Sequence, residues 1–113
     1  MKNLKNQVQL IGRLGADPEV KTLNSGTKVA RFSLATSDYY IDKDGNKVTN
    51  TQWHKIVAWN GGATYSEKYL KKGIELMVSG KLVYSNYDDK DGNKRFATEI
   101  ITHDMNVLSK KGE

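Results

Sequence analysis

The chain of 113 residues contains no cysteine and only one proline. Without cysteine there are no disulfides and no thiolate chemistry, and a reducing cytoplasm is the expected compartment. The first six residues lack the apolar stretch of a signal peptide, and no apolar run approaches the length needed to cross a bilayer. A membrane role is therefore not expected.

Positive charge, by contrast, is in excess. The 18 lysines and arginines outnumber the 13 aspartates and glutamates, which gives a formal net charge of +5. Residues 1–60 carry nine basic and five acidic side chains, whereas residues 61–113 carry nine and eight. This balance is compatible with an anionic partner, and the first half of the chain should supply most of the positive surface. The length predicts a single domain.

The hexapeptide Asp-Lys-Asp-Gly-Asn-Lys occurs twice, at 42–47 and at 89–94. Each copy lies between two runs that alternate apolar and polar residues, and glycine and asparagine tolerate the positive φ of tight hairpin turns. The sequence therefore predicts two long β-hairpins, called here the first finger and the second finger. Cross-strand aromatics also stabilise hairpins that bind nothing, so tyrosines at the stems gain a functional meaning only if both fingers lie over one surface. The stem tyrosines are Tyr39, Tyr40, Tyr84 and Tyr87.

Alternation with a period of two dominates the rest of the chain and predicts strands. The expected strands are 8–14, 28–40, 49–60, 74–84 and 95–108. Between Gly61 and Gly73 the spacing becomes helical, with a helix expected over 63–71 and Gly73 as its C-cap. The order β-β-β-α-β-β predicts an all-β domain with one short helix over residues 1–108: a five-stranded oligonucleotide/oligosaccharide-binding (OB) barrel with two long hairpin extensions. A plain antiparallel sheet with a packed helix is the alternative, and residues 109–113 are expected to form a short tail.

The most informative strand is the segment 51–59, Thr-Gln-Trp-His-Lys-Ile-Val-Ala-Trp. With a period of two, one face carries Trp53, Lys55, Val57 and Trp59, and the other carries His54, Ile56 and Ala58. A lysine between two tryptophans does not fit a core, because its charge would be buried without a partner. It fits a surface on which bases stack on the rings while the lysine meets the backbone. The alternative is that both tryptophans are core or subunit-interface residues.

Catalytic and metal-binding patterns are weak. Both copies of Asp-Lys-Asp-Gly-Asn resemble the start of a calcium loop, but Trp53 and Ile100 stand where a bidentate glutamate is needed. His54 and His103 lie far apart in the sequence, without the spacing of a zinc site. We expect no catalytic residue, no cofactor and no metal. A metal-dependent nuclease using the aspartates of 88–91 is one alternative, although a charged turn tip explains them more simply.

Four segments of the chain, in order, resemble the single-stranded DNA-binding proteins of bacteria. They are 6–20 (NQVQLIGRLGADPEV), 32–37 (FSLATS), 51–57 (TQWHKIV) and 69–73 (YLKKG). The similarity runs from about residue 4 to residue 108. It implies an OB domain that binds single-stranded DNA without sequence preference during replication, recombination and repair, and that has no enzymatic activity. It also implies a homotetramer built as a dimer of dimers.

The resemblance also assigns site residues. The family's stacking aromatics fall on Tyr40, Trp53, Trp59 and Tyr87. Basic positions that match family DNA contacts are Lys5, Lys43, Lys55 and Lys72. Independently of the resemblance, further basic candidates for phosphate contacts are Arg13, Arg31, Lys81 and Arg95. The family's sheet histidine matches His54 and would lie at a subunit contact, whereas Gly61 and Asn86 stand where some relatives have lysine, so the electrostatic share of binding should be smaller here.

Relatives usually continue into a glycine- and proline-rich linker and an acidic tip that recruits replication and repair proteins. This chain ends in Lys-Lys-Gly-Glu at 110–113, so such recruitment is expected only if a longer native tail exists. One further alternative is an OB-fold assembly protein, such as a primosome component, whose aromatic face contacts protein in place of DNA.

Overall fold

The computed structural model describes residues 4–109, which form six strands and one helix. The strands are β1 (Val8–Leu14), β2 (Glu19–Thr22), β3 (Lys28–Ile41), β4 (Lys47–Trp59), β5 (Glu75–Asp88) and β6 (Lys94–Ser109), and α1 (Gly61–Tyr69) lies between β4 and β5. Within this part of the chain, no helix is both long and apolar enough to cross a membrane. β6 includes Ser109, and the rest of the expected tail lies outside the described residues.

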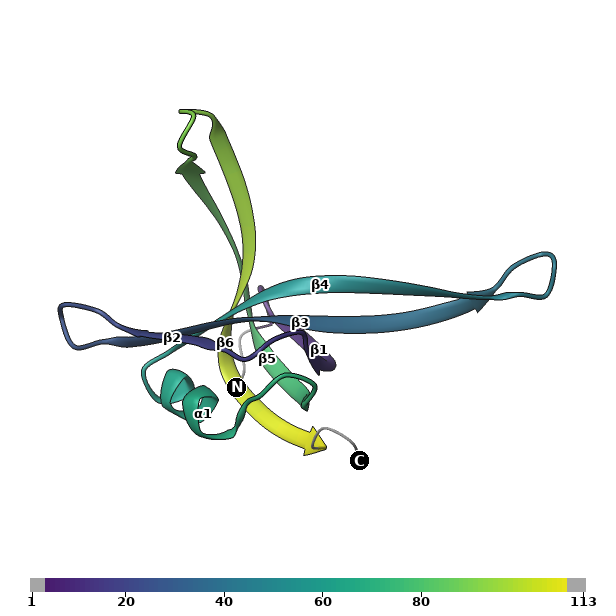
Figure 1. Ribbon diagram of the computed structural model, residues 1–113, viewed down its shortest axis with the longest axis horizontal. Helices are drawn as coiled ribbons and strands as arrows, with labels where there is room; N and C mark the ends of the chain where they lie inside the picture. The colour runs from purple at the N-terminus through teal and green to yellow at the C-terminus, as the bar shows by residue number, and fades with distance from the viewer. Residues whose placement is uncertain (1–3, 110–113) are drawn as a thin grey trace.

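The barrel closes through β1 (Figure 1). Residues 8–13 pair antiparallel with β5, and Arg13 and Leu14 also pair with β3. The resulting strand order around the barrel is β1-β5-β6-β4-β3, with β4 and β6 parallel. The predicted five-stranded OB-type barrel with one short helix is therefore confirmed. β2 is an additional strand on the edge of β3, in a region between the expected strands 8–14 and 28–40 where no strand was predicted.

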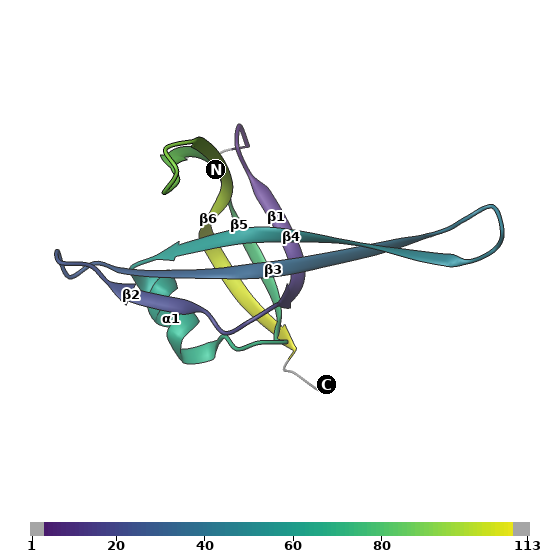
Figure 2. The ribbon, with the colours of Figure 1, turned by 45° about the horizontal axis from the view of Figure 1, so that its top comes forward.

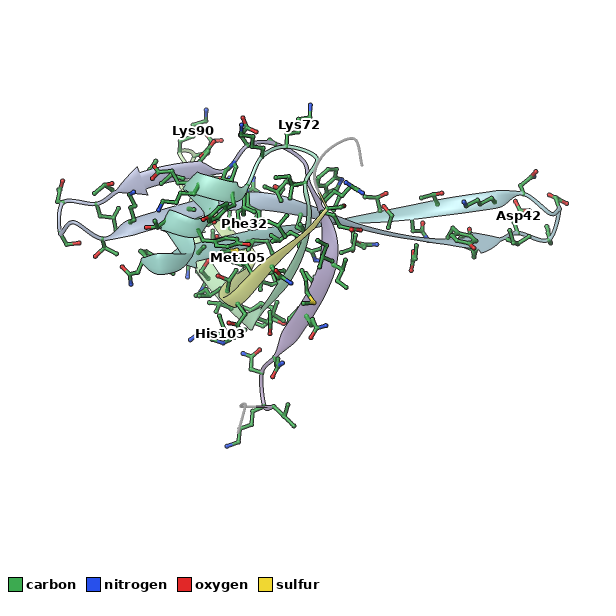
Figure 3. The ribbon with its side chains drawn as sticks, turned by 90° about the horizontal axis from the view of Figure 1, so that it is seen from below. Phe32, Asp42, Lys72, Lys90, His103 and Met105 are labelled. Atoms are coloured by element: carbon green, nitrogen blue, oxygen red, sulfur yellow. The ribbon has the colours of Figure 1, made fainter. Side chains whose placement is uncertain are left out.

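Both predicted fingers are present, and they leave the barrel in different directions (Figures 1 and 2). The first finger is the far part of the β3–β4 hairpin, and the second is the far part of the β5–β6 hairpin. The radius of gyration is 16.1 Å, compared with about 13 Å for a compact chain of this length. The fingers account for this difference because they project into solvent, with Asp42 at the far end of the first one (Figure 3).

The repeated hexapeptide forms the same turn at both tips. Oδ1 of Asp42 accepts hydrogen bonds from the N–H groups of Asp44 and Asn46 at 2.9 and 2.8 Å. Oδ1 of Asp89 accepts the bonds of the corresponding N–H groups, two and four residues further on, at 3.0 and 2.9 Å. The glycine in each turn has a positive φ, 83° and 81°. Because all these contacts lie within five residues, the local sequence is sufficient to dictate both tips.

Alternate residues of the strands fill the barrel as the pattern predicted. Leu34, Ile56, Leu76 and Val78 are at most 1% exposed, and Phe32 packs with them. The helix covers one end of the barrel, where the small side chains of Ala30, Ala58 and Ala63 allow it to approach the sheet closely.

The helix begins and ends two residues earlier than expected, at Gly61 and Tyr69. The prediction that Gly73 caps it was wrong. The chain is already extended at Leu70, whose side chain is buried in the core, and this ends the helix. Gly73, with a φ of 90°, belongs to a separate turn in which the N–H of Ile74 donates to the carbonyl of Lys71 at 3.1 Å.

Candidate nucleic-acid interface

The outer surface of the barrel and of the second finger carries a band of aromatic and basic side chains, called here the platform. Its residues are Arg31 on β3, Trp53, Lys55 and Trp59 on β4, Lys81 and Tyr87 on β5, and Arg95 on β6. Residues paired across neighbouring strands share a face, so the strand register groups them. Ile101 joins the two halves of the platform because it pairs with Val57 of β4 and with Lys81 of β5.

The two tryptophans lie on the platform, as the alternation predicted. Trp53 is 62% exposed and Trp59 is 38% exposed, and Lys55 between them is also exposed. Trp53 is therefore not a core residue, and its ring offers surface on which a base can stack. Val57 shares this face but is only 3% exposed, so the exposed face is not continuous along β4.

In the first finger, Tyr39 and not Tyr40 lies on the platform side. Tyr39 pairs with Thr49, which alternates with Trp53 on one face of β4, whereas Tyr40 pairs with Val48 on the other face. The Nζ atom of Lys47 lies 4.4 Å from the centroid of the Tyr39 ring, a cation–π contact. The sequence analysis placed Tyr39 at the stem of the first finger but not among the residues that stack on bases. The turn type fixes the register of the hairpin, and this register would have placed Tyr39 on the same face as Trp53.

His54 lies on the face of β4 opposite Trp53, as predicted, and is partly buried. Its Nε2 is 2.8 Å from Oγ1 of Thr36 on β3. This contact holds the imidazole against the sheet on the side away from the platform.

In the second finger, Tyr87 pairs with Arg95 across the hairpin and is 52% exposed. Tyr87 thus continues the platform along the second finger. Because the two fingers diverge (Figures 1 and 2), the structure does not bring Tyr40 and Tyr87 over a common surface.

All three of the arginines predicted to contact phosphate have partners within the chain. Nη1 of Arg31 is 2.8 Å from Oε2 of Glu99, and Nε of Arg95 is 2.8 Å from Oδ2 of Asp89. Nη1 of Arg13 donates to the carbonyl of Gly73 at 2.8 Å. Glu99 also pairs with Lys55 in the strand register, so a carboxylate lies among the cations of the platform.

The five predicted lysines are all exposed. Lys55 and Lys81 lie on the platform, and Lys43 lies in the tip of the first finger. Lys5 precedes β1. Lys72 belongs to the turn after α1, where its N–H donates to Oδ1 of Asp17 at 2.8 Å, beside a groove lined by Tyr65 and Tyr69 of the helix.

The carboxylate of Asp89, in the second finger tip, acts within the turn. Hydrogen bonds from the N–H of Asn93, then the contact with Arg95 and a bond from the N–H of Asp91, hold the pKa of Asp89 below its ordinary value of 3.8. Among residues 4–109, no three histidine, aspartate or glutamate side chains are grouped so as to hold a metal ion. The carboxylate of Asp89 is thus occupied by its own turn.

The model of the single-strand binding protein family matches residues 5–108 of this chain. The chain belongs to this family. The similarity extends to single-stranded DNA-binding protein 1 of Xylella fastidiosa, 46% identical over 107 residues, which are 94% of this chain and 79% of that protein. The protein of the same name from Chlorobaculum tepidum is also 46% identical over 107 residues, covering 94% of this chain and 66% of that protein.

Among solved structures, this member of the single-strand binding protein family resembles the Plasmodium falciparum SSB in its complex with ssDNA. The TM-score is 0.86 and the sequence identity is 34%, with 96% of this chain and 99% of that chain covered. The chain spans only part of several curated relatives, for example 60% of the single-stranded DNA-binding protein of Xanthomonas axonopodis. The family expected from the four sequence segments is confirmed.

Proposed function

We propose that this chain binds single-stranded DNA without sequence preference and coats unwound strands during replication, recombination and repair. The observation that carries the proposal is the position of Trp53, which is 62% exposed on a face that also carries Lys55 and Lys81. Stacking on an aromatic ring stabilises a bound base by ~1–3 kcal/mol, and every base offers a π-face, so the interaction tolerates any sequence. The family and the names of its members support the same function.

In this mechanism, bases stack on Trp53 and Trp59, and Tyr87 extends the stack along the second finger. Lys55 and Lys81 neutralise neighbouring phosphates. The affinity should fall as salt is added, and each neutralised phosphate should make the slope of log affinity against log salt concentration more negative by about 0.7. Phosphates farther along the DNA are assigned to Lys5, Lys43 and Lys72, and arginine contacts to Arg13, Arg31 and Arg95. Tyr40, which lies on the face of the first finger opposite the platform, is assigned a base on the resemblance to the family alone.

The binding involves no catalysis and no cofactor. Of the alternatives, the nuclease is disfavoured because Asp89 is held by three hydrogen-bonding groups of its own finger. The role implies a protein of the cytoplasm that is associated with the nucleoid.

The proposed active form is a homotetramer, a dimer of dimers, with His54 at a subunit contact. Besides the family, apolar side chains outside the platform support it: Ile11 on β1 is 50% exposed and Leu108 on β6 is 43% exposed. Another subunit would remove these side chains from water, which is favourable in proportion to the apolar area covered. Sedimentation equilibrium should give four times the 12.7 kDa of one chain, and a monomer at micromolar concentration would contradict this assembly.

Binding isotherms for oligo-dT, a mixed-sequence single strand and a duplex of the same length test the proposed function. Both single strands should bind with similar affinity, the duplex should bind far more weakly, and every strand should remain intact when magnesium is supplied. Failure to bind either single strand would favour the assembly protein. Strand cleavage that requires the metal would favour the nuclease.

A further inference from the structure

The ring of Trp53 lies against the backbone of Gly15. A Cβ placed on Gly15 would be 2.5 Å from Cζ3 and 2.9 Å from Cη2 of the indole, closer than real Cβ contacts. Gly15 does not have a positive φ, so the backbone conformation itself would accept an L side chain. What requires glycine at this position is therefore the space that the ring occupies.

The backbone that meets the ring is held on both sides. The N–H of Gly15 donates to the carbonyl of Ser33 on β3 at 3.1 Å. The preceding residue, Leu14, donates to Ile74 at 3.1 Å and accepts from Gly73 at 2.9 Å. The segment at 14–15 is thus tied to β3 and to the turn before β5, and it offers the indole a rigid surface.

We infer that Gly15 is a positioning residue for base stacking: its bare backbone seats the six-membered end of the Trp53 ring and restricts the ring's motion. The inference rests on the proposed function, because the ring is positioned for a base. Trp53 nevertheless remains 62% exposed, so the contact with Gly15 leaves ring surface open on which a base can stack. A ring that is already ordered loses less rotamer freedom on binding, an advantage of about two- to tenfold in affinity.

The substitution Gly15→Ala tests the contact between the Gly15 backbone and the Trp53 ring directly. Its Cβ would meet only the outer end of an exposed side chain, so the indole can swing aside and the barrel should still fold. The matched control is Gly61→Ala, because a Cβ at Gly61 meets no atom within 4 Å and Gly61 does not have a positive φ. Both substitutions are made together with Trp59→Phe, so that the tryptophan emission comes from Trp53 alone.

Two quantities are measured: the emission anisotropy of Trp53 without DNA, and the dissociation constant for oligo-dT. The inference predicts that Gly15→Ala lowers the anisotropy and weakens oligo-dT binding by about two- to tenfold, with an unchanged thermal midpoint, whereas Gly61→Ala changes neither. Equal binding by Gly15→Ala and its parent would overturn the inference, and so would an equal loss in Gly61→Ala. If the unsubstituted protein did not bind oligo-dT at all, the proposed function would be wrong, an outcome distinct from a binding protein in which Gly15→Ala has no effect.

Discussion

Replacing Glu99 by glutamine should strengthen the binding of single-stranded DNA. Oε2 of Glu99 lies 2.8 Å from Nη1 of Arg31, and Glu99 also pairs with Lys55 in the strand register. A phosphate that approaches Arg31 must therefore displace a carboxylate and then remain beside it. The substitution Glu99→Gln removes this competing negative charge and keeps the shape of the side chain.

The expected gain in affinity follows from the solvent exposure of the Arg31–Glu99 ion pair. The Arg31 side chain is 53% exposed and the Glu99 side chain is 21% exposed. Exposed ion pairs contribute at most about 1 kcal/mol to stability, which is also the Coulomb energy of unit charges about 4 Å apart in bulk water. We therefore expect the affinity for oligo-dT to rise about fivefold at low salt. The log–log salt dependence should become steeper by about 0.7, because one more cation is available to a phosphate.

The control for net charge is Glu67→Gln. Oε1 of Glu67 on α1 lies 2.8 Å from Nζ of Lys28, in an ion pair of the same length that joins the helix to β3, away from the platform. Fluorescence titrations with oligo-dT over a range of salt concentrations would compare the two variants and the parent. The reasoning is refuted if Glu99→Gln binds no more tightly than the parent, or if Glu67→Gln produces the same gain.

Three other substitutions have defined outcomes. Trp53→Ala should weaken oligo-dT binding by ~1–3 kcal/mol in isothermal titration, with the thermal midpoint preserved; unchanged affinity would remove Trp53 from the site. Gly12→Ala should lower the free energy of unfolding in urea by about 1–3 kcal/mol, because its Cβ would lie 2.2 Å from the carbonyl oxygen of Ala35, where β1 closes the barrel; an unchanged urea midpoint would show that β1 can shift freely. Arg95→Gln should raise the pKa of Asp89 towards 3.8, measured by carboxyl NMR, and an identical titration would show that Arg95 has no influence. Since the folded pKa of Asp89 is depressed, its contribution to stability is present above pH 3.8 and is lost as the pH falls through the lower folded value.

Local sequence was sufficient for the parts of the fold that depend on near neighbours. The two fingertips follow from contacts within five residues of Asp42 and Asp89. The core faces of β1, β3 and β5 follow from the alternation, and so does the exposed position of Trp53. The short strand β2 was missed because only Val20 among its four residues is partly buried, so its pairing with β3 leaves almost no apolar pattern.

The features that were missed in the site depend on contacts between distant segments. The ion pair of Arg31 with Glu99 joins residues 68 positions apart in the sequence, and it depends on the parallel pairing of β4 with β6. The contact of Gly15 with Trp53 depends on how β1 crosses the barrel. Alternation along a single strand cannot reveal either contact, because it gives the face of a residue but not its neighbours on other strands.

Stacking on Trp53 is tested most directly in a Trp59→Phe protein titrated with oligo-dT and with an abasic strand of the same length. Both strands carry the phosphates, but only oligo-dT carries bases. Trp53 emission should be strongly quenched by oligo-dT and only slightly by the abasic strand, which should also bind more weakly. Equal quenching by the two strands, or no quenching by a bound oligo-dT, would show that the bases do not lie on this ring.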